Sequence, residues 1–92
     1  MSKVAAIDTA VRMQIAADGK KIGLIDTLNI ARSGYTDANE VSKFLLGVSR
    51  NLKLDMPSRT FRWSTLDPDK LLSKRLDMVI GYIVENTDIT EP

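Results

Sequence analysis

Two apolar stripes at helical spacing constrain this chain most, because each stripe needs a surface to pack against. The residues of the stripes are Val41, Phe44, Leu45, Val48 and Leu52 in the first, and Leu72, Leu76, Val79, Ile80 and Ile83 in the second. This periodicity predicts helices over residues 37–51 and 68–86. A helix with one apolar face must bury that face against another element.

Both predicted helices carry terminal signals. Asp37 is an N-cap candidate, and Asp37 with Glu40 has the spacing of a capping box. Asp67 followed by Pro68 places an N-cap before a proline at the first helical position. Pro57 ends the first helix, since proline biases the residue before it toward an extended conformation.

Residues 4–31 allow two interpretations. Asp18-Gly19 suits a two-residue type I′ turn, and a hairpin around it gathers apolar side chains on one face. The pairs on that face are Ile15 with Ile22, Met13 with Leu24, Val11 with Asp26, Thr9 with Leu28 and Ile7 with Ile30. The alternative is a helix pair, with Val4, Ile7, Val11 and Ile15 as one stripe. We favour the hairpin, because a helix pair gives no reason for the apolar residues of one segment to stand opposite those of the other.

A third strand is expected over residues 58–64, where Phe61 and Trp63 share one face. The predicted fold class is α+β: a small antiparallel sheet, made of the N-terminal hairpin and this strand, with two helices packed on one face. The alternative is an all-α four-helix domain. Residues 1–92 are expected to form a single domain, whose tail from residue 86 onward frays.

Composition excludes several classes of protein. The 92 residues include no cysteine and no histidine, which excludes disulfides, Cys/His zinc sites and Ser-His-Asp triads. The five glycines form no phosphate-binding pattern. We therefore expect a binding protein and not an enzyme, with no catalytic residue, metal, cofactor or small-molecule substrate. Without a signal peptide or a run of about 18 apolar residues, the expected setting is the cytoplasm, with no membrane partner.

Charge is distributed unevenly along the chain. The net charge is only +1, but the segment from Lys43 to Arg62 holds five basic residues and one acidic residue. The predicted sheet adds Arg12 and Lys21 on its open face, with Lys20 at the hairpin tip. Such a basic surface suits phosphates or an acidic partner, and an ordinary solvated face is the alternative.

Aromatic residues are interleaved with this basic segment. Phe61 and Trp63 either stack bases while neighbouring arginines hold phosphates, or fill the core beneath the helices. Tyr35 follows a glycine and is expected to be exposed near a loop, as an interface anchor. The predicted partner-binding residues are Arg12, Lys20, Lys21, Arg59, Arg62 and Tyr35.

Two function classes follow: a binder of nucleic acid or of a nucleoprotein complex, and a protein inhibitor or adaptor that docks on a larger complex. They merge when a small protein occupies the nucleic-acid path of a nucleoprotein complex. The alternatives are a helix-turn-helix-like DNA-binding regulator, with residues 30–34 and 41–45 as parts of its motif, and a structural or assembly component of a larger particle.

In size, and in lacking cysteine, histidine and a catalytic set, the chain resembles small phage-encoded anti-defence proteins, including those of anti-CRISPR type. The resemblance implies a host protein or nucleoprotein complex as partner, inhibited by occupancy in the host cytoplasm. The resemblance concerns size and general composition, and no sequence motif supports it, so it assigns no functional residue.

Overall fold

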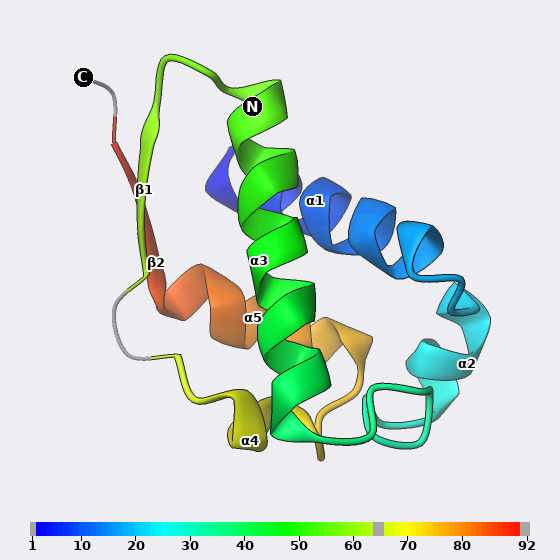
Figure 1. The fold of residues 1–92 in the computed structure, drawn as a ribbon. Coiled ribbons are helices and arrows are strands. Elements are labelled where there is room, and N and C mark those ends of the chain that lie inside the picture. The colour runs from blue at the N-terminus through cyan, green and yellow to red at the C-terminus, as the bar shows by residue number, and fades with distance from the viewer. Residues whose placement is uncertain (1, 64–65, 91–92) are drawn as a thin grey trace.

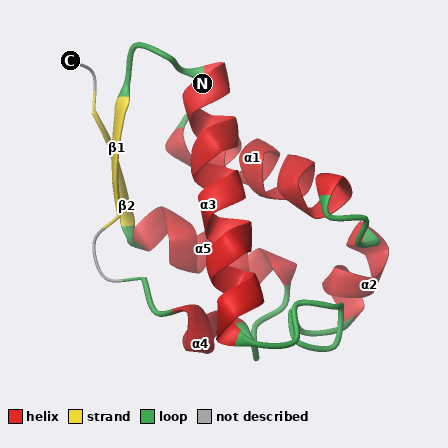
Figure 2. Cartoon of the chain, in the orientation of Figure 1, coloured by secondary structure: helices red, strands yellow, loops and turns green. Residues whose placement is uncertain are grey.

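Helices form most of the described part of the chain, and one pair of strands lies along their side (Figures 1 and 2). The computed structural model describes residues 2–63 and 66–90. Its elements are α1 (Lys3–Ala17), α2 (Ile22–Thr27), α3 (Ala38–Asp55), β1 (Thr60–Trp63), α4 (Pro68–Leu71), α5 (Leu76–Glu85) and β2 (Thr87–Thr90). The α+β class is confirmed, but the strands are not those of the predicted sheet.

The predicted N-terminal hairpin is wrong, because its first strand is the helix α1. The stripe that the helical interpretation requires is buried here, and it consists of Ala6, Ile7, Ala10, Val11 and Ile15. Gly19 has the positive φ expected of it, at 74°, but it ends a helix. Its N–H donates to Ala16 O at 3.0 Å, and Lys20 N donates to Ile15 O at 3.1 Å. These two bonds form a Schellman C-terminal motif, which uses the same glycine conformation as a hairpin turn.

The helix α3 begins as predicted and ends later. Asp37 accepts a hydrogen bond from Glu40 N at 2.9 Å, and Glu40 accepts one from Thr36 N at 3.2 Å. The helix continues to Asp55, past the predicted end at residue 51 and just short of Pro57. The predicted stripe is its buried face, so the local signals fixed both its start and its orientation.

The second predicted helix is divided into α4 and α5. The break at residues 72–75 leaves two carbonyl groups that accept from a distant segment: Ile30 N donates to Lys74 O at 2.9 Å, and Ala31 N to Leu72 O at 3.0 Å. An unbroken helix would have used those carbonyls internally. The break between α4 and α5 therefore lies where the backbone bonds to residues 30 and 31.

The third predicted strand is confirmed as β1, but its partner is the tail that was expected to fray. The ladder is antiparallel and runs from Thr60 opposite Thr90 to Trp63 opposite Thr87. Phe61 and Trp63 are half-buried against the core, whereas Thr60 and Arg62 are exposed. Within the described residues, the core lies between helices instead of between helices and a sheet, and no helix is long and apolar enough to cross a membrane.

Thr87 offers a test of this strand pairing, because its Oγ1 is buried and has no hydrogen-bond partner among the residues that the structure describes. Thr87→Val keeps the β-branched shape and removes the unsatisfied hydroxyl, so we expect the free energy of unfolding to rise by about 1 kcal/mol. Thr90→Val is the control, since Thr90 is exposed and its hydroxyl is hydrogen-bonded to that of Thr60. Urea unfolding measures both. Loss of stability in Thr87→Val alone would contradict the buried position of Thr87.

Candidate partner-binding surface

The structure does not bring the six predicted partner-binding residues together. Arg12 lies on α1, Lys20 and Lys21 lie in the turn between α1 and α2, and Tyr35 precedes α3. Arg59 and Arg62 lie just before and within β1. Figure 1 shows the α1–α2 turn and β1 on opposite sides of α3, so these residues form no single surface.

The predicted cations have different surroundings. Arg12 lies on a helix and not on a sheet face, and its Nε is 3.2 Å from Asp8 Oδ1 in an exposed ion pair. Lys21 is exposed. Arg59 is half-buried and donates from Nη1 to Met56 Sδ at 3.3 Å. Arg62 is exposed and stands opposite Asp88 in the ladder.

Tyr35 is buried, at 3% exposure, so the expectation of an exposed interface anchor is wrong. Its hydroxyl donates to Asp18 Oδ2 at 2.5 Å, and its ring centroid lies 5.0 Å from that of Phe44. Lys20, expected at an exposed hairpin tip, is half-buried instead. Its Nζ lies 5.3 Å from the Tyr35 ring centroid and donates to Gly34 O at 3.1 Å. Tyr35 thus links the end of α1 to the start of α3.

The titration of Tyr35 follows from this burial. Desolvation raises the pKa of its hydroxyl well above the usual value, and the hydrogen bond to Asp18 raises it further. The hydroxyl therefore remains protonated and keeps its role as a donor. The shallow cleft beside it is lined by Asp18, Lys20, Glu40 and Lys43 among others, so its charges balance and favour no ligand of one sign.

Tyr35→Phe tests the structural role of Tyr35. We expect a loss of roughly 1–2 kcal/mol in the free energy of unfolding at neutral pH, because the bond to Asp18 disappears. The raised pKa also means that above about pH 10 the unfolded chain binds fewer protons than the folded chain. The stability of the wild type should therefore fall as pH rises above this value, and its advantage over Tyr35→Phe should shrink.

Chemical unfolding from neutral pH to about pH 11 measures this difference. Tyr82→Phe is the matched control, since it removes the hydroxyl of the other tyrosine, which accepts a hydrogen bond from Asp67 N. That control should keep the alkaline decline of the wild type. An advantage over Tyr35→Phe that stayed constant with pH would contradict the role assigned to Tyr35.

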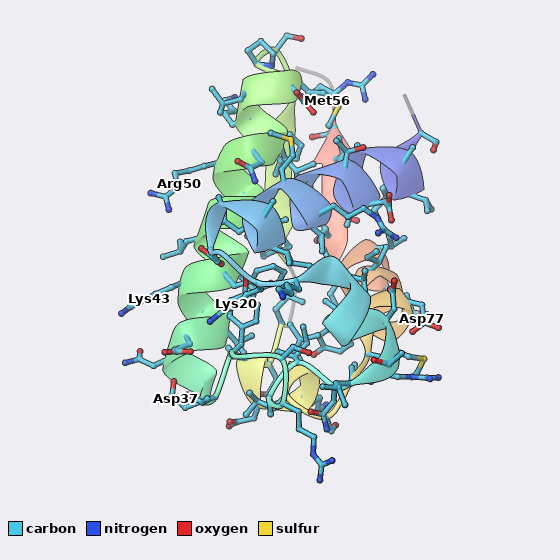
Figure 3. The ribbon with its side chains drawn as sticks, turned by 90° about the vertical axis from the view of Figure 1, so that its right-hand side faces the viewer. Lys20, Asp37, Lys43, Arg50, Met56 and Asp77 are labelled. Carbon is cyan, nitrogen blue, oxygen red and sulfur yellow. The ribbon has the colours of Figure 1, made fainter. Side chains whose placement is uncertain are left out.

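A more coherent surface lies on the outer side of α3. The side chains of Lys43, Leu46, Arg50, Lys53 and Leu54 are all exposed, and we call them the α3 basic face. Their spacing of three and four residues places them on the side of the helix opposite its buried stripe. Figure 3 shows Lys43 and Arg50 pointing away from the body of the molecule on the side of α3.

The α3 basic face is unusual in exposing large apolar side chains beside its cations. Leu46 is 64% exposed and Leu54 is 76% exposed. Lys53 donates from Nζ to Arg59 O at 3.0 Å, which holds the ammonium group near the end of the helix. The sequence did point to this basic segment. A projection of the predicted helix would also have placed Lys43, Leu46 and Arg50 on one side. The prediction of a sheet placed the expected binding surface on other cations.

An apolar groove adjoins this face. It has a volume of about 330 Å³ and is lined by Ser42, Leu45, Leu46, Trp63 and Leu66, and we call it the Trp63 groove. The Trp63 Nε1 donates to Ser49 Oγ at 2.6 Å, which fixes the indole against α3. Trp63 thus packs on the core, as one of the two sequence interpretations expects, and it also lines an open groove.

The helix-turn-helix alternative does not match the observed spacing. The helix α2 ends at Thr27 and α3 begins at Ala38, so ten residues separate them. The motif joins its two helices by a turn of about three or four residues. Residues 30–34, one of the two segments assigned to the motif, form turns.

Metal binding is a further function that clustered acidic side chains could support. In the part of the chain that the structure describes, no three acidic side chains gather where they could hold a metal ion. Comparison with known proteins finds no matching family model, no matching curated protein and no matching solved structure. The function is therefore inferred from the residues and their geometry.

Proposed function

We propose that this protein binds nucleic acid through the phosphate backbone, alone or within a nucleoprotein complex, and that it does so with the α3 basic face. The observation that carries this proposal is the clustering of Lys43, Arg50 and Lys53 on one exposed side of a single helix. The two acidic residues of α3, Glu40 and Asp55, stand near its two ends and not between these cations.

The dimensions of this face suit a nucleic-acid strand. From Lys43 to Lys53 the helix rises by roughly 15 Å, at about 1.5 Å per residue. Phosphates follow one another at about 3.4 Å along the axis of each strand of a duplex, so this length spans several of them. Because the face lies on one helix, the backbone that carries these cations is already ordered, and binding must order only their side chains.

Binding of this kind supports a function by occupancy. The molecule measures 38 × 23 × 19 Å, which is small enough to cover part of a nucleic-acid path. A domain held by its cations on the nucleic acid of a complex blocks access to that strand without any chemical step. Inhibition of a host nucleoprotein complex in the cytoplasm, as the resemblance to anti-defence proteins implies, is the form of this function that we propose.

Reversal of two charges tests the proposed surface. We expect Lys43→Glu/Arg50→Glu to weaken binding to a mixed-sequence oligonucleotide by at least tenfold, and to lower the slope of log affinity against log salt by about two. Both side chains are exposed, so the melting temperature should change little. Fluorescence anisotropy with a labelled strand, at several salt concentrations, measures the effect.

The matched control is Arg32→Glu/Arg75→Glu, which makes the same change in net charge. Both arginines are exposed and lie together near the Thr27–Asn29 segment, away from the outer side of α3. We expect this control to bind with a much smaller loss. An equal loss in the two double variants would show that net charge alone matters, and an unchanged affinity in the α3 variant would remove this face from the site.

A further inference from the structure

The Trp63 groove and the α3 basic face are continuous, because Leu46 belongs to both. Lys43 lies three residues before Leu46 on the helix and Arg50 lies four residues after it, so a cation stands on each side of this shared residue. A ligand that bridges the two surfaces must therefore combine negative charges with a group that enters an apolar groove.

The lining of the groove decides what that group is. Three leucines and one indole form most of its wall, and Ser42 adds one hydroxyl. The indole N–H already donates to Ser49, so Trp63 offers its ring and no hydrogen bond. Such a wall holds the face of a flat aromatic ring by stacking and dispersion, and it does not read the edges of a base.

A single-stranded nucleic acid has this combination of groups. Its phosphates carry the negative charge, and its unpaired bases have free faces that stack on aromatic side chains. In a duplex the bases are paired and stacked inside, and taking one out costs several hydrogen-bonding and stacking contacts. The positive flank of the groove also favours this ligand over an apolar peptide without acidic residues.

We propose that the Trp63 groove receives an unpaired base while Lys43 and Arg50 hold the adjacent phosphates, so that the protein prefers single strands to duplexes. This inference rests on the proposed function and names its ligand class. It differs from the sequence interpretation in the source of the cations. Arg62 and Trp63 alternate along β1 and point to opposite sides, so the cations come from α3.

The single tryptophan of the chain makes the test direct, since all its indole fluorescence comes from Trp63. Three probes of equal length are titrated at one salt concentration: a single strand, its duplex and a single strand with abasic sites throughout. We expect the single strand to change Trp63 fluorescence and to bind about tenfold more tightly than the abasic strand. The duplex should bind more weakly than the single strand and leave the fluorescence unchanged.

A matched pair of variants locates the base. Leu46→Ala removes part of the groove wall, whereas Met78→Ala removes a comparably exposed apolar side chain on α5 that lies outside both the groove and the α3 basic face. We expect Leu46→Ala to lower the affinity for the single strand toward that for the abasic strand. Met78→Ala should leave both affinities as in the wild type.

The outcomes separate this inference from the proposed function. Equal binding of all three probes with no change in Trp63 fluorescence would overturn the inference and leave the phosphate-binding function standing. Failure of every probe to bind at low salt would overturn both. A synthetic peptide of alternating glutamate and leucine that changed Trp63 fluorescence, where the single strand did not, would assign the groove to a protein partner and overturn the inference.

Discussion

The packing of α1 across α3 decides how the rest of the molecule is arranged. Gly47 lies buried at this contact, where a Cβ would meet the side-chain amide of Gln14. Asn51 donates to Ala10 O at 3.0 Å and ties the two helices together. Small residues at such a crossing let two backbones approach closely, so the apolar stripe of α1 is buried there and not in a sheet.

This packing also determines which surfaces stay open. The inner side of α3 is occupied by the core, and the β1–β2 pair lies along the flank of the helices (Figure 1). The outer side of α3 is left exposed with its cations and two leucines. A lone exposed leucine is ordinary on a protein surface, but here one leucine joins a cationic face to an apolar groove. That continuity is why the candidate ligand combines phosphate charge with an aromatic ring.

Burial separates the residues that stabilise the fold from those that remain for binding. Tyr35 and Lys20 are drawn into contacts between the α1–α2 turn and the start of α3, so they stabilise a junction. Lys43 and Arg50 are exposed and remain available to a partner. Lysine thus has two roles in this protein, because the ammonium group of Lys20 is bonded to a backbone carbonyl whereas the side chain of Lys43 is exposed to solvent.

The sequence by itself determined the start of α3, its buried stripe and the strand at β1, because caps and periodicity act over a few residues. It did not determine the N-terminal segment, since Asp18-Gly19 suits a hairpin turn and a helix end equally well. Only the tertiary structure decided the break before α5, the pairing of the tail with β1 and the burial of Tyr35. It also brought Leu46 and Trp63 to one groove. Each of these depends on contacts between segments distant in sequence, which local patterns do not encode.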